Sequence, residues 1–177
     1  LSATEVSSAY LEHIKKINPE LNAIVDDMSD EAIKRAESLD QATKAGEPKG
    51  RLFGVPVTIK INVDQKGYAT SNGVPALKNL IANSNAPIVD HLRNAGAIFV
   101  GRTNTPEFSF RADTENPLHG RTNNPWGKHL SPGGSSGGAS SAVMAGMCAL
   151  AHGNDIGGSL RFPSVATGAV TLKPGLG

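Results

Sequence analysis

The segment PIVDHLRNAGAIFV, residues 87–100, gives the clearest indication of the fold class. Proline suits the first turn of a helix, so the segment from Pro87 to Ala95 is expected to be helical. Gly96 separates this helix from the apolar run Ala97 to Val100, which is typical of a buried strand. A helix joined to a buried strand in this way is half of an α/β crossover, and it indicates an α/β protein.

The preceding strand of the crossover is expected at Val55-Pro56-Val57-Thr58-Ile59-Lys60, which is rich in β-branched residues. Pro56 restricts this segment to a sheet edge or to the start of a strand. A loop marked by glycine and asparagine follows, from Lys66 to Gly73.

Two amphipathic helices are expected in the first 46 residues. The first begins at a capping box, Ser2 to Glu5, and ends just before Pro19. The second is capped by Ser29 and ends at Gly46. A short strand is expected between them, at Leu21 to Val25.

The polar segment from Arg102 to Leu130 predicts long surface connections around one short helix, and long loops often carry function. A small-residue helix is expected at Gly137 to Leu150, and a further strand at Ala169 to Leu172. Eleven of the 20 glycines lie from Gly133 onward. Such density is typical of a main chain that approaches a ligand or makes tight turns.

Composition excludes several classes of protein. The 177 residues carry a formal net charge of +1, so there is no electrostatic footprint for nucleic acid or an anionic membrane. The single cysteine, Cys148, lies in an apolar run, which favours a small buried hydrophobe over a catalytic thiol and suits a cytoplasmic protein. No apolar stretch reaches the roughly 18 to 20 residues that span a bilayer. The five histidines lack metal-ligand spacing and are interpreted mostly as surface or hydrogen-bonded residues, so neither a metal nor another cofactor is expected.

The first of two glycine-serine clusters is Ser131-Pro132-Gly133-Gly134-Ser135-Ser136-Gly137-Gly138, directly before the small-residue helix. Its amides could converge on an anion at the helix N-terminus. A phosphate-binding loop would need a Gly-Lys-Ser/Thr sequence, but no lysine lies between Lys128 and Lys173. A nucleophile elbow, Gly-x-Ser-x-Gly, matches at Gly133 to Gly137, yet the required Asp and then His do not follow in this chain.

The second cluster is Asn154-Asp155-Ile156-Gly157-Gly158-Ser159-Leu160-Arg161-Phe162-Pro163. Four successive amides, at Ile156, Gly157, Gly158 and Ser159, could surround a developing oxyanion. One such donor contributes roughly 3 to 4 kcal/mol to lowering a barrier. The alternative is a glycine-rich turn with a capping serine.

Several ordered motifs together resemble the amidase signature family, and the resemblance covers essentially the whole chain. They are Gly-Val-Pro-Val-Thr-Ile before Lys60, the two glycine-serine clusters, Arg102-Thr103-Asn104-Thr105-Pro106-Glu107-Phe108, Thr114-Glu115-Asn116, Asn124-Pro125-Trp126 and Leu172-Lys173-Pro174. The resemblance implies an α/β fold with a mixed β-sheet core and helices on both faces. It also implies a helical segment over about 1–46 and a catalytic core over about 50–177, with the C-terminal remainder of the family's domain absent.

The resemblance implies a Ser–Ser–Lys triad that hydrolyses amides without a cofactor. The matching positions are Ser159 as nucleophile, Ser135 as the bridging serine after a cis peptide bond, and Lys60 as base. A lysine acts as a base only when neutral, so its pKa must fall from about 10.4 towards 7, which burial can achieve. Asp155 and Arg161 are expected to pair and hold the loop, with Ser136 as a supporting hydroxyl.

The family usually has Asp directly after the base lysine, where this chain has Ile61. The predicted function is an amidohydrolase that acts on a small-molecule amide, with a homodimer as an open alternative and no nucleic acid or membrane partner. Two other functions remain: a non-catalytic fragment or degenerate homologue serving as a binding module, and an amidotransferase component that releases ammonia from glutamine.

Overall fold

The computed structural model describes residues 1–175 of the chain, so the last two residues of the predicted core lie outside it. A four-stranded sheet is ordered β1-β3-β2-β6, with β2 parallel to both neighbours and β1 antiparallel to β3. A two-stranded ribbon, β4-β5, lies outside this sheet. The elements in chain order are α1 (Ala3–Leu21), β1 (Ile24–Asp27), α2 (Ser29–Lys44), β2 (Pro56–Lys60), η1 (Pro75–Leu77), α3 (Pro87–Asn94), β3 (Ile98–Thr103), η2 (Glu107–Ser109), β4 (Glu115–Asn116), β5 (Gly120–Arg121), α4 (Gly137–Met144), β6 (Leu150–Ala151) and α5 (Arg161–Thr167).

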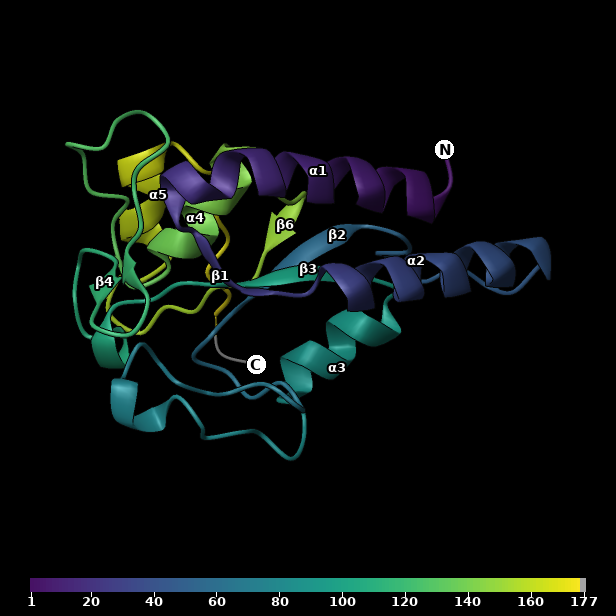
Figure 1. Ribbon diagram of the computed structural model, residues 1–177, viewed down its shortest axis with the longest axis horizontal. Coiled ribbons are helices and arrows are strands. Elements are labelled where there is room, and N and C mark those ends of the chain that lie inside the picture. The colour runs from purple at the N-terminus through teal and green to yellow at the C-terminus, as the bar shows by residue number, and fades with distance from the viewer. Residues whose placement is uncertain (176–177) are drawn as a thin grey trace.

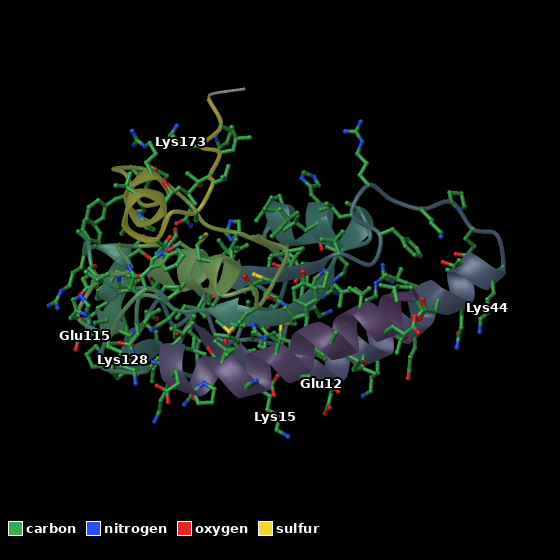
Figure 2. The ribbon with its side chains drawn as sticks, turned by 90° about the horizontal axis from the view of Figure 1, so that it is seen from above. Glu12, Lys15, Lys44, Glu115, Lys128 and Lys173 are labelled. Carbon is green, nitrogen blue, oxygen red and sulfur yellow. The ribbon has the colours of Figure 1, made fainter. Side chains whose placement is uncertain are left out.

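Helices cover both faces of the mixed sheet, which confirms the predicted α/β architecture. In Figure 1, α1 and α4 lie on one side of the sheet and α3 lies on the other. The alternation of side chains along β3 explains the two layers, because Ile98 and Val100 join the core beneath α1, α2 and α4, whereas Phe99 joins the core beneath α3. Figure 2 shows Glu12 and Lys15 pointing away from the body of the molecule, on the solvent side of α1.

The N-terminal helices differ from the prediction at their ends. The capping box is present, because Ser2 Oγ accepts from the Glu5 amide at 3.0 Å. Pro19, however, does not end α1, which continues to Leu21. A proline so close to the C-terminal end of a helix removes one main-chain hydrogen bond of the last turns. Asn22 then ends the helix in a left-handed conformation, and its amide donates to the Asn18 carbonyl.

Other helix and strand boundaries also differ from the prediction. Ser29 is the first residue of α2 rather than its cap, and the short strand runs over Ile24–Asp27. The small-residue helix ends at Met144, and Leu150–Ala151 form the edge strand β6 beside β2. Gly146, with φ of 71°, turns the chain between them.

The strand predicted at Ala169 to Leu172 was wrong. The chain forms α5 at Arg161–Thr167 instead, and then runs without regular structure to the end of the described residues. Val170 is 100% exposed and has no strand partner within residues 1–175, so its β-branched side chain has no sheet to join. No described helix has both the length and the apolar character that crossing a bilayer requires.

Candidate active site

The site lies where the carboxyl ends of parallel strands meet. Lys60 is the last residue of β2, and Asn154 follows the edge strand β6, which pairs with β2 at Val57 and Thr58. Because side chains alternate along a strand, Val57 and Ile59 pack in the core beneath α3, whereas Thr58 and Lys60 point to the face that α4 covers. The fold therefore delivers the Lys60 amine to the N-terminal end of α4.

The first glycine-serine cluster forms the turn that enters α4, and the peptide bond between Gly134 and Ser135 is cis. Its glycines are required by close packing. A Cβ atom on Gly134 would lie 2.3 Å from the Arg111 carbonyl oxygen, and one on Gly138 would lie 2.6 Å from the Asn104 main chain. The turn therefore packs closely against the neighbouring loops, and this packing fixes the Ser135 side chain relative to β2.

Lys60 is completely buried and hydrogen-bonded to three oxygens. Its Nζ lies 2.6 Å from Ser135 Oγ, 3.1 Å from Ser136 Oγ and 2.9 Å from Asn154 Oδ1. Burial lowers the pKa of Lys60 to about 7, although the negative charge of Asp155 acts in the opposite direction. Near neutral pH a large fraction of the amine is therefore unprotonated and able to accept a proton.

Hydrogen-bond chemistry distinguishes the two serines. Ser136 Oγ donates to the Asn154 carbonyl at 3.3 Å, and an amide oxygen such as Asn154 Oδ1 can only accept. A neutral Lys60 amine has two N–H groups, which these two oxygens accept, and one lone pair. The lone pair is left for the hydroxyl of Ser135, which is also the closest of the three oxygens.

A pair of amide side chains that sequence reasoning missed also contacts Lys60, through Asn154. Asn154 Nδ2 donates to Asn62 Oδ1 at 3.0 Å, and Asn62 Nδ2 donates back to Asn154 Oδ1 at 3.2 Å. The available signal was position alone: Asn62 is two residues after Lys60, and Asn154 opens the second glycine-serine cluster.

Asp155 organises the loop that carries Ser159. Its side chain is completely buried and accepts the amides of Gly158 at 2.7 Å, Leu160 at 3.1 Å and Arg161 at 3.2 Å. The Arg161 guanidinium adds two contacts of 3.0 Å, giving the expected ion pair. The hydrogen bond from Arg161 is the main reason that the pKa of Asp155 is well below its usual range.

Ser159 is attached to the serine cluster through the main chain, because its carbonyl accepts the Ser136 amide at 3.1 Å. No side-chain hydrogen bond joins Ser159 to Ser135 within residues 1–175. Of the four expected oxyanion donors, the Gly158 amide is already taken by Asp155. The amides of Ile156, Gly157 and Ser159 have no hydrogen-bond partner in this part of the chain, and a Cβ on Gly157 would meet nothing within 4 Å.

Two nearby titratable side chains are not part of this hydrogen-bond network. Cys148 is buried, with its Sγ 3.6 Å from Thr58 Oγ1, and burial raises the pKa of its thiol to about 12, as suits a hydrophobe rather than a nucleophile. His152 is largely enclosed, and burial lowers its pKa to about 4. His91 and His129 are exposed and His13 is hydrogen-bonded to the Ala145 carbonyl, whereas His152 and His119 each have one buried ring nitrogen without a partner among residues 1–175.

Comparisons with known proteins show which family has this fold and these motifs. The family model described as Amidase matches residues 5–177. The structure superposes with a TM-score of 0.91 on a bacterial aryl acylamidase described as belonging to the amidase signature enzymes, at 34% identity, over 94% of this chain and 35% of that one. The chain belongs to the amidase signature family.

Curated relatives are similar over the whole chain. An indoleacetamide hydrolase of Bradyrhizobium diazoefficiens is 55% identical over 98% of this chain and 33% of its own length. An acylamidase of Rhodococcus erythropolis is 45% identical over 100% of this chain and 37% of its own. A glutamyl-tRNA(Gln) amidotransferase component of Acaryochloris marina is 41% identical over 99% of this chain and 36% of its own. The chain therefore spans about a third of the length of these relatives.

Proposed function

We propose that this chain carries the reacting side chains of an amidohydrolase that cleaves carboxamide C–N bonds through a seryl acyl-enzyme. The observation that carries the proposal is the buried Lys60 amine, which is hydrogen-bonded to Ser135 at the cis Gly134–Ser135 bond. A non-catalytic binding module would have no need for a buried lysine with a pKa near neutrality.

In the proposed reaction, Ser159 Oγ attacks the carbonyl carbon. Its proton passes to Ser135 Oγ as the Ser135 proton moves to Lys60 Nζ. The free amides of Ile156, Gly157 and Ser159 stabilise the oxyanion. Lys60 then returns a proton through Ser135 to the leaving nitrogen as the C–N bond breaks. Water, activated by the same relay, hydrolyses the ester and releases a carboxylic acid.

The relatives suggest which amides to offer. They include an indoleacetamide hydrolase, an acylamidase and an amidotransferase component, at 55%, 45% and 41% identity. We place a small arylacetamide first, because the relative with the higher identity carries that name. Release of ammonia from glutamine is the second candidate, and it rests on the amidotransferase relative.

The test is labelling with a fluorophosphonate, followed by mapping of the adduct. We expect one adduct, on Ser159, that is lost in Ser159→Ala and reduced about 10⁴-fold in rate in Lys60→Ala, because a triad acts as a unit. Ser84→Ala, which changes an exposed serine, is the matched control. An adduct on Ser135 would reject the assignment of the nucleophile. Turnover of indoleacetamide, an anilide and glutamine then separates the candidate functions.

A further inference from the structure

The amide pair of Asn62 and Asn154 belongs to a closed ring of hydrogen bonds around the base. From Asn62, the ring continues to Ser109 Oγ at 3.1 Å and then to Thr105 Oγ1 at 2.9 Å. Thr105 Oγ1 donates to the Ser135 carbonyl at 3.0 Å, which returns the ring to the residue that contacts Lys60. One continuous network therefore fixes both the base and the bridging serine.

The backbone at Ser109 indicates that this ring is under constraint. Phe108 and Ser109 have φ angles of 52° and 60°, in the left-handed region that residues other than glycine seldom adopt. Such conformations persist where the surrounding structure determines them, and they cluster at functional sites. Ser109 Oγ accepts the Asn62 amide and donates its single proton either to Asn72 Oδ1 or to Thr105 Oγ1, and these contacts supply that determination.

The orientation of the two amides follows from their pairing. Asn154 Nδ2 is committed to Asn62 Oδ1, so Asn154 must present its oxygen, and not its nitrogen, to Lys60 Nζ. That oxygen is a neutral acceptor. A carboxylate at the same place would bring a full negative charge into hydrogen-bond contact with the amine and would favour its protonated form.

We propose that Asn62 and Asn154 are positioning residues for Lys60, which hold its amine against Ser135 and keep it available as a base by offering an uncharged acceptor. This inference rests on the proposed function, in which Lys60 is the base. It also gives the side chain after the base a limited role, because Ile61 is buried and leaves the polar contacts of Lys60 to the two asparagines and the two serines.

Few other charged groups act on the protonation of Lys60. Asp155 is the carboxylate that acts on Lys60, and its charge is offset by the paired Arg161 guanidinium. His152 is neutral near pH 7, because burial and the proximity of Lys60 lower its pKa to about 4. A new carboxylate at position 154 or 62 should therefore control the protonation of Lys60.

The experiment is an NMR titration of the protein with ¹³C-labelled lysine, in which the Lys60 signal is identified by its absence from Lys60→Met. Three variants each replace one amide by a carboxylate: Asn154→Asp in contact with Nζ, Asn62→Asp one residue further along the ring, and Asn79→Asp at an exposed control position. We expect the Lys60 pKa to rise by about one to three pH units in Asn154→Asp, by a smaller amount in Asn62→Asp, and not at all in Asn79→Asp. The rate of fluorophosphonate labelling should fall on the acid side of its pH profile, and the midpoint of this fall, here called the acid limb, should move by the same number of pH units.

The outcomes separate this inference from the proposed function. If Lys60 titrates near pH 7 in the unmodified protein but Asn154→Asp and Asn62→Asp do not move it, the positioning role is rejected and the base assignment stands. If Lys60 titrates near 10.4 in the unmodified protein, the base assignment itself fails. Circular dichroism checks folding, and Asn62→Asp alone decides the question if Asn154→Asp does not fold.

Discussion

The two halves of the candidate site differ in how firmly they are built. The Lys60 amine is hydrogen-bonded to three side-chain oxygens. Lys60, Ser135 and Ser136 are at most 1% exposed. Around Ser159 the loop is open: Ile156 is fully exposed, and the space beside Gly157 and Gly158 is empty to 4 Å. The half around Lys60, the proposed base, is called the base half, and it is complete within the described residues. The half around Ser159, the proposed nucleophile, is called the nucleophile half, and it depends mainly on one carboxylate, Asp155.

This difference shows where each half obtains its precision. The base half is held by the sheet and by α4, so it inherits the rigidity of the core. The nucleophile half is held by local hydrogen bonds to Asp155, with one main-chain link from Ser159 to Ser136. Three experiments test this contrast between the two halves.

The largest expected effect is on the pH dependence of stability, through Lys60→Met. The folded state lowers the pKa of Lys60 to about 7, against about 10.4 in an unfolded chain. Between these values the unfolded state binds a proton that the native state does not, so the free energy of unfolding rises with pH by about 4 to 5 kcal/mol. The variant lacks this term. Urea unfolding of both proteins from pH 6 to 10 measures the difference.

The comparison between the two proteins is needed because another buried group acts in the opposite direction. Burial raises the pKa of Cys148 to about 12, so stability falls as pH rises above the ordinary thiol value of about 8.5. That contribution is common to both proteins and cancels in their difference. If the free energy of unfolding depends on pH in the same way in both proteins, Lys60 is protonated in the folded state and its amine is not prepared to act as a base.

Much of the fold was predictable because its signals are local. The β-branched run ending at Lys60 and the Pro87-led helix specify the crossover, and a capping box gives the start of α1. The errors arose where tertiary context decides. A β-branched segment such as Ala169 to Leu172 becomes a strand only beside another strand. Pro19 would end the helix only if no later residue, such as Asn22, capped it.

The site divides in the same way. Lys60, Ser135 and Ser159 were predicted from motifs, because their spacing resembles that of a family. Asn62 and Asn154 were missed, because an asparagine in a loop is indistinguishable from any other until the fold brings the two amides together. The commitment of the Gly158 amide to Asp155 was equally invisible, since a run of glycines shows which amides are accessible but not which are already bonded.

The second expected effect concerns the nucleophile half, through Asp155→Asn. An amide cannot replace both carboxylate oxygens, which accept three main-chain amides and the Arg161 guanidinium. Displacement of Ser159 by even 1 Å should slow fluorophosphonate labelling by about 10- to 100-fold. Because the charge of Asp155 raises the pKa of Lys60, its removal should lower that pKa, so the acid limb should move to lower pH. Asp30→Asn, at an exposed position on α2, is the control.

Labelling of Asp155→Asn at the unmodified rate would show that the loop needs no carboxylate. A slower rate with an unchanged acid limb would show instead that Asp155 acts on the position of Ser159 alone and not on the charge of Lys60.

The smallest effect compares two adjacent glycines in the open loop. A Cβ atom has free space at both Gly157 and Gly158, but only Gly158 has a φ of 124°, which other residues strongly disfavour. Gly157→Ala should therefore change the free energy of unfolding by less than about 0.5 kcal/mol. Gly158→Ala should lower it by about 1 to 2 kcal/mol, because Asp155 holds the Gly158 amide in place. Urea unfolding measures both, and equal values would show that the loop relaxes freely and that Asp155 does not fix its backbone.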